Sequence, residues 1–238
     1  MGGRRASYGI DAPGVVITFA LLAVAGFGLA RVARPLRGFA IPGGVFAAEA
    51  VLMVWSSRFG KRRVVRRMLD EVALAPDARV LDVGCGRGLV LIEAARRVPQ
   101  GRAVGVDLWK HSDQSGNSLK VTLANATAEG LADRVKVHDG DARRLPFDDG
   151  CFDAVVSSLV VHNIPDRDGR ADAIREMARM LRPGGRLALL DFRHTADYAK
   201  TLRAAGMAQV RRSGLRFGVF PPVRVVTARK EGLATGRG

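Results

Sequence analysis

The feature that most constrains the fold is the stretch VLDVGCGRG at residues 80–88. An apolar run that carries Asp82 breaks into glycines at three alternate positions, Gly84, Gly86 and Gly88. This order, followed by apolar residues at helical spacing, predicts a buried strand, a tight turn and the start of a helix. Glycine at such a turn lets the backbone approach a ligand at the helix N-terminus. The chain is therefore expected to build a ligand site around a strand–turn–helix unit.

Short β-branched runs alternate with helical patterns from about residue 72 onward, which predicts a parallel sheet with crossover helices. The expected strands are 79–83, 103–107, 134–139, 152–158 and 186–192, and the expected helices are 89–98, 116–132, 171–181 and about 196–205. The last two runs, 209–220 and 223–230, are separated only by two prolines, so they should pair antiparallel. We predict an α/β fold with a doubly wound, mostly parallel seven-stranded sheet and an antiparallel last strand.

The glycine spacing also limits the type of ligand. A dinucleotide fingerprint would place glycine or alanine at position 89, where this chain has Leu89, and the Gly-Lys-Ser/Thr of a P-loop is absent. Asp82 would repel a pyrophosphate, but it suits a ligand that carries an amino group and a positive charge. The pattern therefore favours a ligand with an amino group and a positive charge over a nucleotide phosphate.

The sequence resembles the class I S-adenosylmethionine-dependent methyltransferases from about residue 60 to 230. Four motifs in the family's order carry the resemblance: VLDVGCGRG at 80–88, VGVD at 104–107, DGDARRLPFDDGCFDAVVSS at 139–158 and MLRPGGRLALLDF at 180–192. Within the class, the sequences of the last two motifs resemble those of the quinone-biosynthesis C-methyltransferases and other small-molecule methyltransferases. The resemblance implies a Rossmann-like fold, S-adenosylmethionine as the cofactor and methyl transfer as the activity.

The resemblance also implies the roles of individual residues. Asp107 would hold the ribose hydroxyls, and Asp141 and Ala142 would bind the adenine. The full set of cofactor contacts expected from the motifs is Asp82, Gly84, Cys85, Gly86, Gly88, Asp107, Leu108, Asp141, Ala142 and Ser157. Asp82 could instead be a hydrogen-bond partner at the end of a strand.

Methyl transfer requires few catalytic side chains, because a sulfonium methyl group is already activated. The reaction needs a nucleophile held in line with the S–CH3 bond in a site that excludes water. A general base is needed only where the acceptor is protonated. His162, after the fourth strand, is the candidate base, with Asn163 beside it as a candidate acceptor contact. Both could simply cap the next segment. His111, in the polar loop 108–117, is a second acceptor candidate, although that loop could equally lead into a helix capped by Ser115. No metal site is expected.

Two apolar stretches precede this domain. Residues 12–30 contain no charge and are long enough to cross a membrane, whereas residues 38–57 contain Pro42, a Gly pair and Glu49. The second stretch could therefore span or lie at the interface. A cleaved signal peptide and the core helix of a soluble protein are the alternatives to a membrane segment. Glu49 is a candidate functional carboxylate or a residue at the interface.

The formal charge of +15 is concentrated in the N-terminal part, where residues 1–70 carry eleven Lys and Arg against three acidic residues, a net +8. Basic residues flanking apolar segments favour anionic lipid headgroups as partners, through residues 12–67, over nucleic acid. The cluster at 61–67 predicts that the domain after it is cytoplasmic. If both stretches span, the Arg31–Arg37 loop lies outside, so either the hairpin is shallow or only the first segment crosses.

We therefore divide the chain into membrane-associated segments at 1–60, a methyltransferase domain at 61–230 and a tail at 231–238. Its two cysteines, Cys85 and Cys151, are typical of a reduced compartment. The expected activity is methyl transfer to a small, apolar or membrane-resident acceptor that is quinone-, lipid- or phenol-like. The alternatives are a non-catalytic cofactor-binding module and a soluble RNA methyltransferase. The second is disfavoured because SSLVVHN replaces the aromatic tetrad after the fourth strand.

Overall fold

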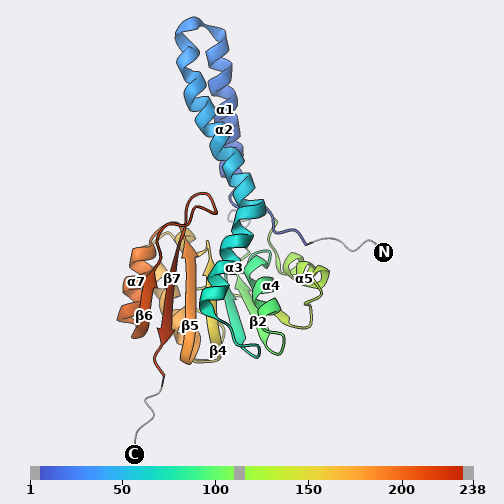
Figure 1. The fold of residues 1–238 in the computed structure, drawn as a ribbon, viewed down its shortest axis with the longest axis vertical. Helices are drawn as coiled ribbons and strands as arrows, with labels where there is room; N and C mark the ends of the chain where they lie inside the picture. Colours follow the sequence, from blue (N-terminus) through green and yellow to red (C-terminus); the bar gives the residue numbers. More distant parts are fainter. Residues whose placement is uncertain (1–5, 110–115, 233–238) are drawn as a thin grey trace, which may run out of the picture.

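The computed structural model describes residues 6–109 and 116–232 and contains a seven-stranded sheet in the order β3-β2-β1-β4-β5-β7-β6 (Figure 1). The strands are β1 Arg79–Val83, β2 Arg102–Asp107, β3 Val135–Asp139, β4 Phe152–Ser158, β5 Leu181–Asp191, β6 Met207–Arg212 and β7 Arg224–Lys230. β7 pairs antiparallel with both β5 and β6, and the other pairs are parallel. The predicted fold class is confirmed.

Helices cover both faces of the sheet. They are α3 Lys61–Val72, α4 Leu89–Arg97, α5 Leu119–Ala128, α6 Arg167–Met180 and α7 Thr195–Ala204, with a short 3₁₀ helix, η3, at Val161–Asn163. One core cluster joins α3, α4 and α5 to one face, and a second joins α6 and α7 to the other. Because successive strand residues point to opposite faces, the buried runs of β1, β2 and β4 supply both clusters.

The element boundaries differ from the predicted ones where a local cap decides them. Helix α5 begins at Leu119 because the Ser118 hydroxyl accepts a hydrogen bond from the backbone N–H of Val121, while Ser115 lies outside the described residues. Helix α6 begins at Arg167, earlier than expected, because Asp166 caps it through the N–H of Gly169. Both caps satisfy donors that the first turn of a helix leaves unpaired.

The two apolar stretches form an antiparallel helical hairpin that projects away from the domain (Figure 1). α1 covers Pro13–Val32, η1 Arg34–Phe39 and α2 Ala40–Trp55, and the π-helical turn η2 at Ser56–Gly60 leads into α3. By length and composition, two helical spans can cross a membrane, Pro13–Val32 and Arg34–Val72, and only 11% of the apolar window of each is buried. A core helix of a soluble protein would be mostly buried, so this exposure disfavours that alternative. The boundary predicted at residue 60 falls inside a continuous helical segment.

Small residues bring the two hairpin helices together. A Cβ built on Gly26 would lie 2.8 Å from the Cα of Gly43, whereas Gly28 on the same helix has nothing within 4 Å. Gly43 therefore has a packing role that its place after Pro42 does not reveal in the sequence. Close backbone approach through small residues is a common way for apolar helices to pack without a hydrophobic driving force.

We expect Gly26→Ala to weaken the hairpin and Gly28→Ala to leave it unchanged or slightly more stable. Alanine favours a helix over glycine by about 1 kcal/mol, but overpacking at Gly26 costs about 1–3 kcal/mol because the partner atoms are backbone. Thermal unfolding of the full chain in detergent, followed by circular dichroism, should separate the two variants. Equal midpoints for both would contradict the observed packing.

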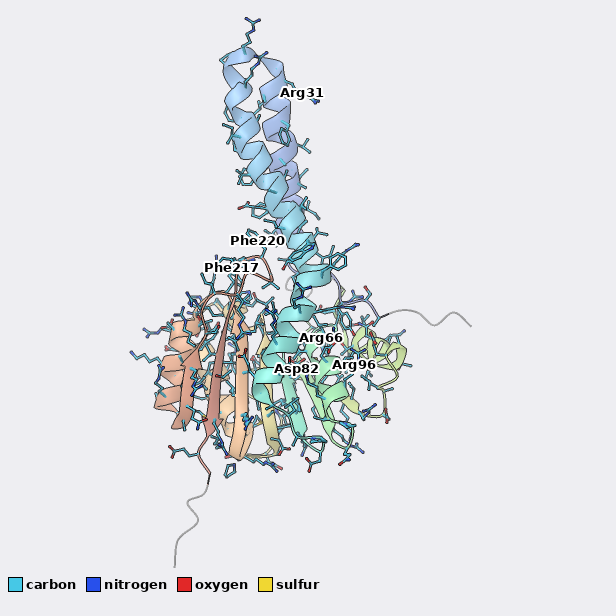
Figure 2. All side chains as sticks on the ribbon, in the orientation of Figure 1. Arg31, Arg66, Asp82, Arg96, Phe217 and Phe220 are labelled. Atoms are coloured by element: carbon cyan, nitrogen blue, oxygen red, sulfur yellow. The ribbon has the colours of Figure 1, made fainter. Side chains whose placement is uncertain are left out.

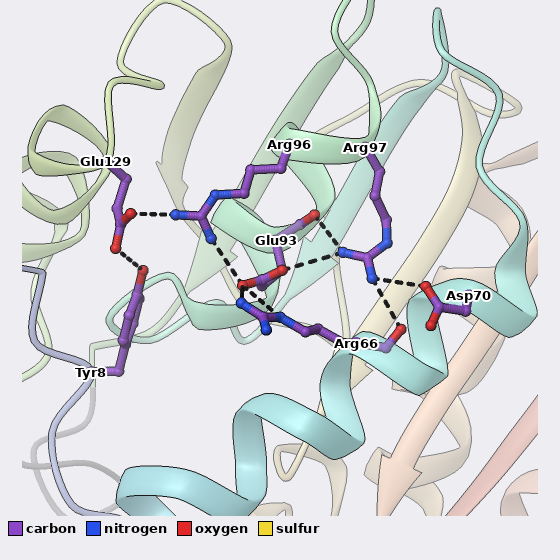
Figure 3. Close-up of polar contacts among 7 residues, drawn as sticks. All are labelled: Tyr8, Arg66, Asp70, Glu93, Arg96, Arg97 and Glu129. Atoms are coloured by element: carbon purple, nitrogen blue, oxygen red, sulfur yellow. Dashed lines mark hydrogen bonds and ion pairs between the residues drawn. The ribbon is translucent and has the colours of Figure 1, made fainter.

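Charged side chains fix the base of the hairpin to the domain (Figure 3). The buried carboxylate of Glu93 on α4 accepts hydrogen bonds from Arg66 on α3 at 3.1 Å and from Arg96 at 2.9 Å. Burial acts to raise the pKa of Glu93, but the hydrogen bond and charge of Arg66 outweigh it and the pKa is lowered. Arg96 also pairs with Glu129, which accepts from the Tyr8 hydroxyl before α1. Part of the basic cluster at 61–67 is thus used within the protein.

Candidate cofactor and acceptor site

The glycine turn between β1 and α4 approaches its neighbours too closely for any side chain at its first position. Gly84 has a φ of +74°, and a Cβ there would lie 2.2 Å from a methyl carbon of Val160. Its N–H donates to the carbonyl of Val106 at 2.7 Å, which ties the turn to β2. From α5, the Asn125 amide donates to the carbonyl of Arg87 at 2.9 Å, and the Thr122 hydroxyl donates to that of Gly86. The turn is therefore held open as a rigid backbone cradle.

Asp107 ends β2 directly beside this turn. Its Oδ2 accepts from the N–H of Gly86 at 2.7 Å, and its Oδ1 accepts from the N–H of Trp109 at 2.6 Å. A carboxylate at the end of a strand is a group that can accept hydrogen bonds from hydroxyls of a bound ligand. The carboxylate thus both shapes the turn and faces the cavity in front of it.

Asp82, labelled in Figure 2, is fully buried, and no side chain among the described residues forms a hydrogen bond with its carboxyl group. Burial, with a further contribution from the charge of Asp107, raises the pKa of Asp82 to about 8. A buried carboxyl group without a side-chain partner is costly unless a ligand compensates it. A ligand with an ammonium group near this carboxyl would favour its ionised form.

The raised pKa of Asp82 predicts that cofactor affinity depends on pH. Below about pH 8 the carboxyl holds a proton that a cationic ligand must displace, so affinity for S-adenosylhomocysteine should rise at least about tenfold from pH 6 to 8. Without ligand, Asp82 stays protonated in the folded chain up to about pH 8, whereas in the unfolded chain it loses its proton above its ordinary pKa of 3.8. The free energy of unfolding of the cofactor-free protein should therefore fall as the pH rises from about 4 to 8.

Asp82→Asn is the matched variant for this prediction, because it keeps the shape of the side chain and cannot titrate. Calorimetric titrations at several pH values should show that the variant loses the pH dependence. Its cofactor-free form should also keep a thermal midpoint that changes less with pH than that of the wild type. A wild-type affinity that is flat between pH 6 and 8 would refute the proposed role of Asp82.

A cavity of about 110 Å³ lies in front of the glycine turn, and most of the predicted cofactor residues line it. Those at the cavity are Gly84, Cys85, Gly86, Asp107, Leu108, Asp141 and Ala142. Gly88 forms the N-cap of α4, one step behind the cavity. Burial raises the pKa of the Cys85 thiol, so this thiol is neutral and packs as an apolar group. Asp141 is paired with Arg143, whose Nη2 lies 2.6 Å from its Oδ2.

Three of the predicted cofactor residues, Asp82, Gly88 and Ser157, do not line this cavity. Ser157 is buried in the sheet, where its hydroxyl donates to the carbonyl of Val83 at 2.7 Å, and the next residue, Ser158, lines the cavity instead. Ser157 and Ser158 differ in this way because alternate residues of β4 face opposite sides of the sheet, and a cofactor contact of Ser157 stays a prediction. His111 lies outside the described residues.

A second, larger cavity of about 520 Å³ lies beside the first, at the base of the helical hairpin. His162 lines it, and Asn163 lines both cavities. His162 Nδ1 lies 2.9 Å from Oδ1 of the buried Asp191 without forming a hydrogen bond, and the His162 backbone N–H donates to Asp191 Oδ2 at 3.2 Å. Asp191 Oδ2 also accepts from the hydroxyl of Tyr198 at 3.1 Å. An imidazole that lines the cavity is a group that can accept a proton from a molecule bound there.

Several residues at these cavities were not predicted. Lys61 and Asp11 line both cavities and form an ion pair at 2.9 Å, although 50 residues separate them in the chain. Leu159 also lines both, with a left-handed φ of 59° that a branched side chain rarely adopts. Lys61 lies in the basic cluster, so its sequence context indicated lipid contact and gave no sign of a site.

Sequence comparison identifies relatives with the same motifs. The family described as methyltransferase domain matches residues 81–189. Methyltransferase GfsG of Streptomyces halstedii is 37% identical over 146 residues, which are 60% of this chain and 49% of the relative. The ubiquinone/menaquinone biosynthesis C-methyltransferase UbiE of Geotalea daltonii is 32% identical over 136 residues, 56% of this chain and 54% of the relative. The chain spans about half the length of the curated relatives it matches.

Solved structures share the fold of the domain. The [4+2]-cyclase SpnF superposes with a TM-score of 0.58 at 21% identity, covering 72% of this chain and 82% of that one. Geranyl diphosphate C-methyltransferase from Streptomyces coelicolor A3(2), solved with S-adenosyl-L-homocysteine, superposes with a TM-score of 0.58 at 17% identity. The match covers 71% of this chain and 75% of that one.

The site itself fits the cofactor of this family. The cradle at Gly84 admits no Cβ, the carboxylate of Asp107 faces the cavity, and the buried Asp82 lacks a side-chain partner, which an ammonium group would supply. These features, together with the matched domain at 81–189, agree with the predicted cofactor, S-adenosylmethionine. Residues 81–189 therefore match the methyltransferase domain family, and the site that they build fits S-adenosylmethionine.

Proposed function

We propose that this protein is a membrane-anchored methyltransferase that acts on a small apolar acceptor. The observation that carries the proposal is the position of the hairpin. Its exposed apolar helices rise from the edge of the sheet where the parallel strands end (Figure 1), and Asp11 and Lys61 at its base line the cofactor cavity. Ligands of open α/β sheets bind at that edge. An acceptor dissolved in the bilayer would therefore reach the site along the hairpin.

The names of relatives support an apolar acceptor. UbiE proteins are named for ubiquinone and menaquinone biosynthesis, and one structural neighbour was solved with geranyl diphosphate. S-adenosylmethionine supplies an activated methyl group when it is bound. The chain itself would position the acceptor, exclude water and, for a phenol, alcohol or amine, take the proton at the His162 imidazole.

The direct test is to incubate the purified full chain with S-adenosylmethionine labelled in the methyl group and a membrane lipid extract. We expect label in one apolar product, identified by mass spectrometry, and none when the chain carries Asp107→Ala. Cofactor binding without any labelled product from lipid, and none from RNA, would instead indicate a non-catalytic binding module.

Fractionation tests the membrane assignment separately. We expect the protein to sediment with membranes and to stay there in high salt, because insertion of the hairpin relies on apolar contacts that salt does not screen. Protease added to sealed cells should leave the domain intact, because we propose that it is cytoplasmic. Release by salt would indicate that surface charge alone holds the protein to lipid or to nucleic acid.

A further inference from the structure

The larger cavity joins the domain to the base of the hairpin. Four residues, Asp11, Lys61, Leu159 and Asn163, line both this cavity and the cofactor cavity, so the two adjoin. Its volume of about 520 Å³ lies in the range of small-molecule sites. A molecule in the larger cavity would therefore lie next to the cofactor.

The hairpin provides much of the wall of this cavity. Val15 and Phe19 of α1 and Met53 of α2 line it, and Phe220 closes it from the loop between β6 and β7 (Figure 2). Phe19 is held in place by stacking on Phe46 of α2, with ring centroids 5.8 Å apart. The Phe220 N–H donates to the Ser56 hydroxyl at 2.9 Å, which ties that loop to the hairpin. These walls are apolar and fixed, so they suit an apolar ligand.

Two carboxylates line this cavity, Asp11, which is paired with Lys61, and Glu49 of the hairpin. Glu49 is the single charged residue in α2, in the sequence AIPGGVFAAEAVLMVW, and it lines the cavity. An ionisable group in an apolar helix is costly unless it pairs or serves a ligand. The same cavity contains His162 and Arg193 at the end nearer the sheet. The cavity therefore combines apolar walls with polar groups at separate places along them.

We propose that the hairpin forms one wall of the acceptor site, and that Glu49 accepts a hydrogen bond from a hydroxyl or amine of an otherwise apolar acceptor. This inference rests on the proposed function, because the ligand is assigned as the methyl acceptor. It gives the hairpin a role in substrate selection in addition to anchoring. It also identifies the acceptor class as amphipathic molecules with a hydrogen-bond donor, such as alkylphenols.

Binding of two non-physiological probes tests this without any methyl transfer. The full chain is reconstituted in phosphatidylcholine nanodiscs with saturating S-adenosylhomocysteine. Saturable binding of tritiated 4-nonylphenol is measured above its partition into empty discs, and nonylbenzene serves as the probe without a hydroxyl. We expect saturable binding of 4-nonylphenol by the wild type.

Met53→Trp should fill the cavity and weaken binding of 4-nonylphenol by at least about tenfold. Val51→Trp is the matched control, since Val51 is 67% exposed on the same helix whereas Met53 is 8% exposed. Glu49→Leu should weaken the binding of 4-nonylphenol about tenfold and leave the affinity for nonylbenzene within about twofold of wild type. Only the phenol loses a hydrogen bond to a charged group. Affinity for S-adenosylhomocysteine should be unchanged in all three variants.

The proposal is overturned if the wild type shows no saturable binding of 4-nonylphenol, or if Met53→Trp binds like Val51→Trp. It is equally overturned if Glu49→Leu affects both probes to the same extent. These outcomes are distinct from failure of the proposed function. If the probes bind as expected but no lipid becomes labelled, the cavity remains a ligand site and the catalytic assignment fails.

Discussion

Replacing Asp107 by alanine is expected to raise the dissociation constant of S-adenosylhomocysteine by at least about a hundredfold. If the carboxylate holds both ribose hydroxyls, the variant loses two hydrogen bonds to a charged group, each worth about 1.5–3 kcal/mol. It also loses the bonds to the N–H groups of Gly86 and Trp109 that shape the turn. Isothermal titration calorimetry on the full chain measures the effect.

Two further variants separate loss of the ligand contact from loss of the fold. Asp107→Asn keeps one acceptor oxygen and should lose less affinity than the alanine variant. Asp148→Ala removes an exposed carboxylate in the turn before β4 and should bind like the wild type. Thermal unfolding of each cofactor-free variant checks that the domain is intact. An Asp107→Ala variant that is folded and binds within about threefold of wild type would refute the ribose assignment.

Replacing His162 by alanine should lower kcat by about 100- to 10,000-fold for an acceptor that must lose a proton, the range that general base catalysis contributes. His162 lines the hairpin-side cavity and not the cofactor cavity, so cofactor affinity should stay within about twofold. Burial and the neighbouring Asp191 raise the pKa of Tyr198, so its hydroxyl stays protonated and keeps donating to Asp191. Asp191 also accepts from the backbone N–H of His162, which holds this residue beside the cavity.

The measurement is kcat of the wild type and of His162→Ala at the same pH, with the acceptor recovered from the labelled lipid extract. His138→Ala is the control, because His138 is exposed on β3 and lines neither cavity. A full rate in His162→Ala would mean that the acceptor is already ionised or reacts at carbon, and that His162 has a structural role.

The sequence predicted the sheet well because the signals for it are local. The buried runs of β1 and β4 were predicted with the observed bounds, 79–83 and 152–158. The antiparallel β7 follows from a connection too short for a crossover helix. The glycine turn and Asp107 were also recognisable, since a backbone cradle and a carboxylate at the end of a strand are defined by a few consecutive residues. The resemblance to the methyltransferases was therefore recognisable before any coordinates.

The acceptor side of the site was predicted only in part. His162 was identified by its place after β4, but Asp191, which accepts from its backbone N–H, is 29 residues away. The pairing of Gly26 with Gly43 was hidden because each glycine alone indicates only a weak helix. Contacts between residues far apart in the chain depend on how the helices pack, and no local pattern encodes them.

The succession of strands and helices along the chain, the cofactor turn and two apolar helices were thus determined by the sequence itself, through hydrophobic periodicity and the conformational freedom of glycine. Only the tertiary structure decided that the hairpin rises over the carboxyl edge of the sheet, where Glu49 and His162 line one cavity. The physical reason is that apolar patterning selects which residues are buried or helical. The direction in which a rigid helix such as α2–η2–α3 leaves the domain is set by specific contacts, among them the ion pair of Lys61 with Asp11.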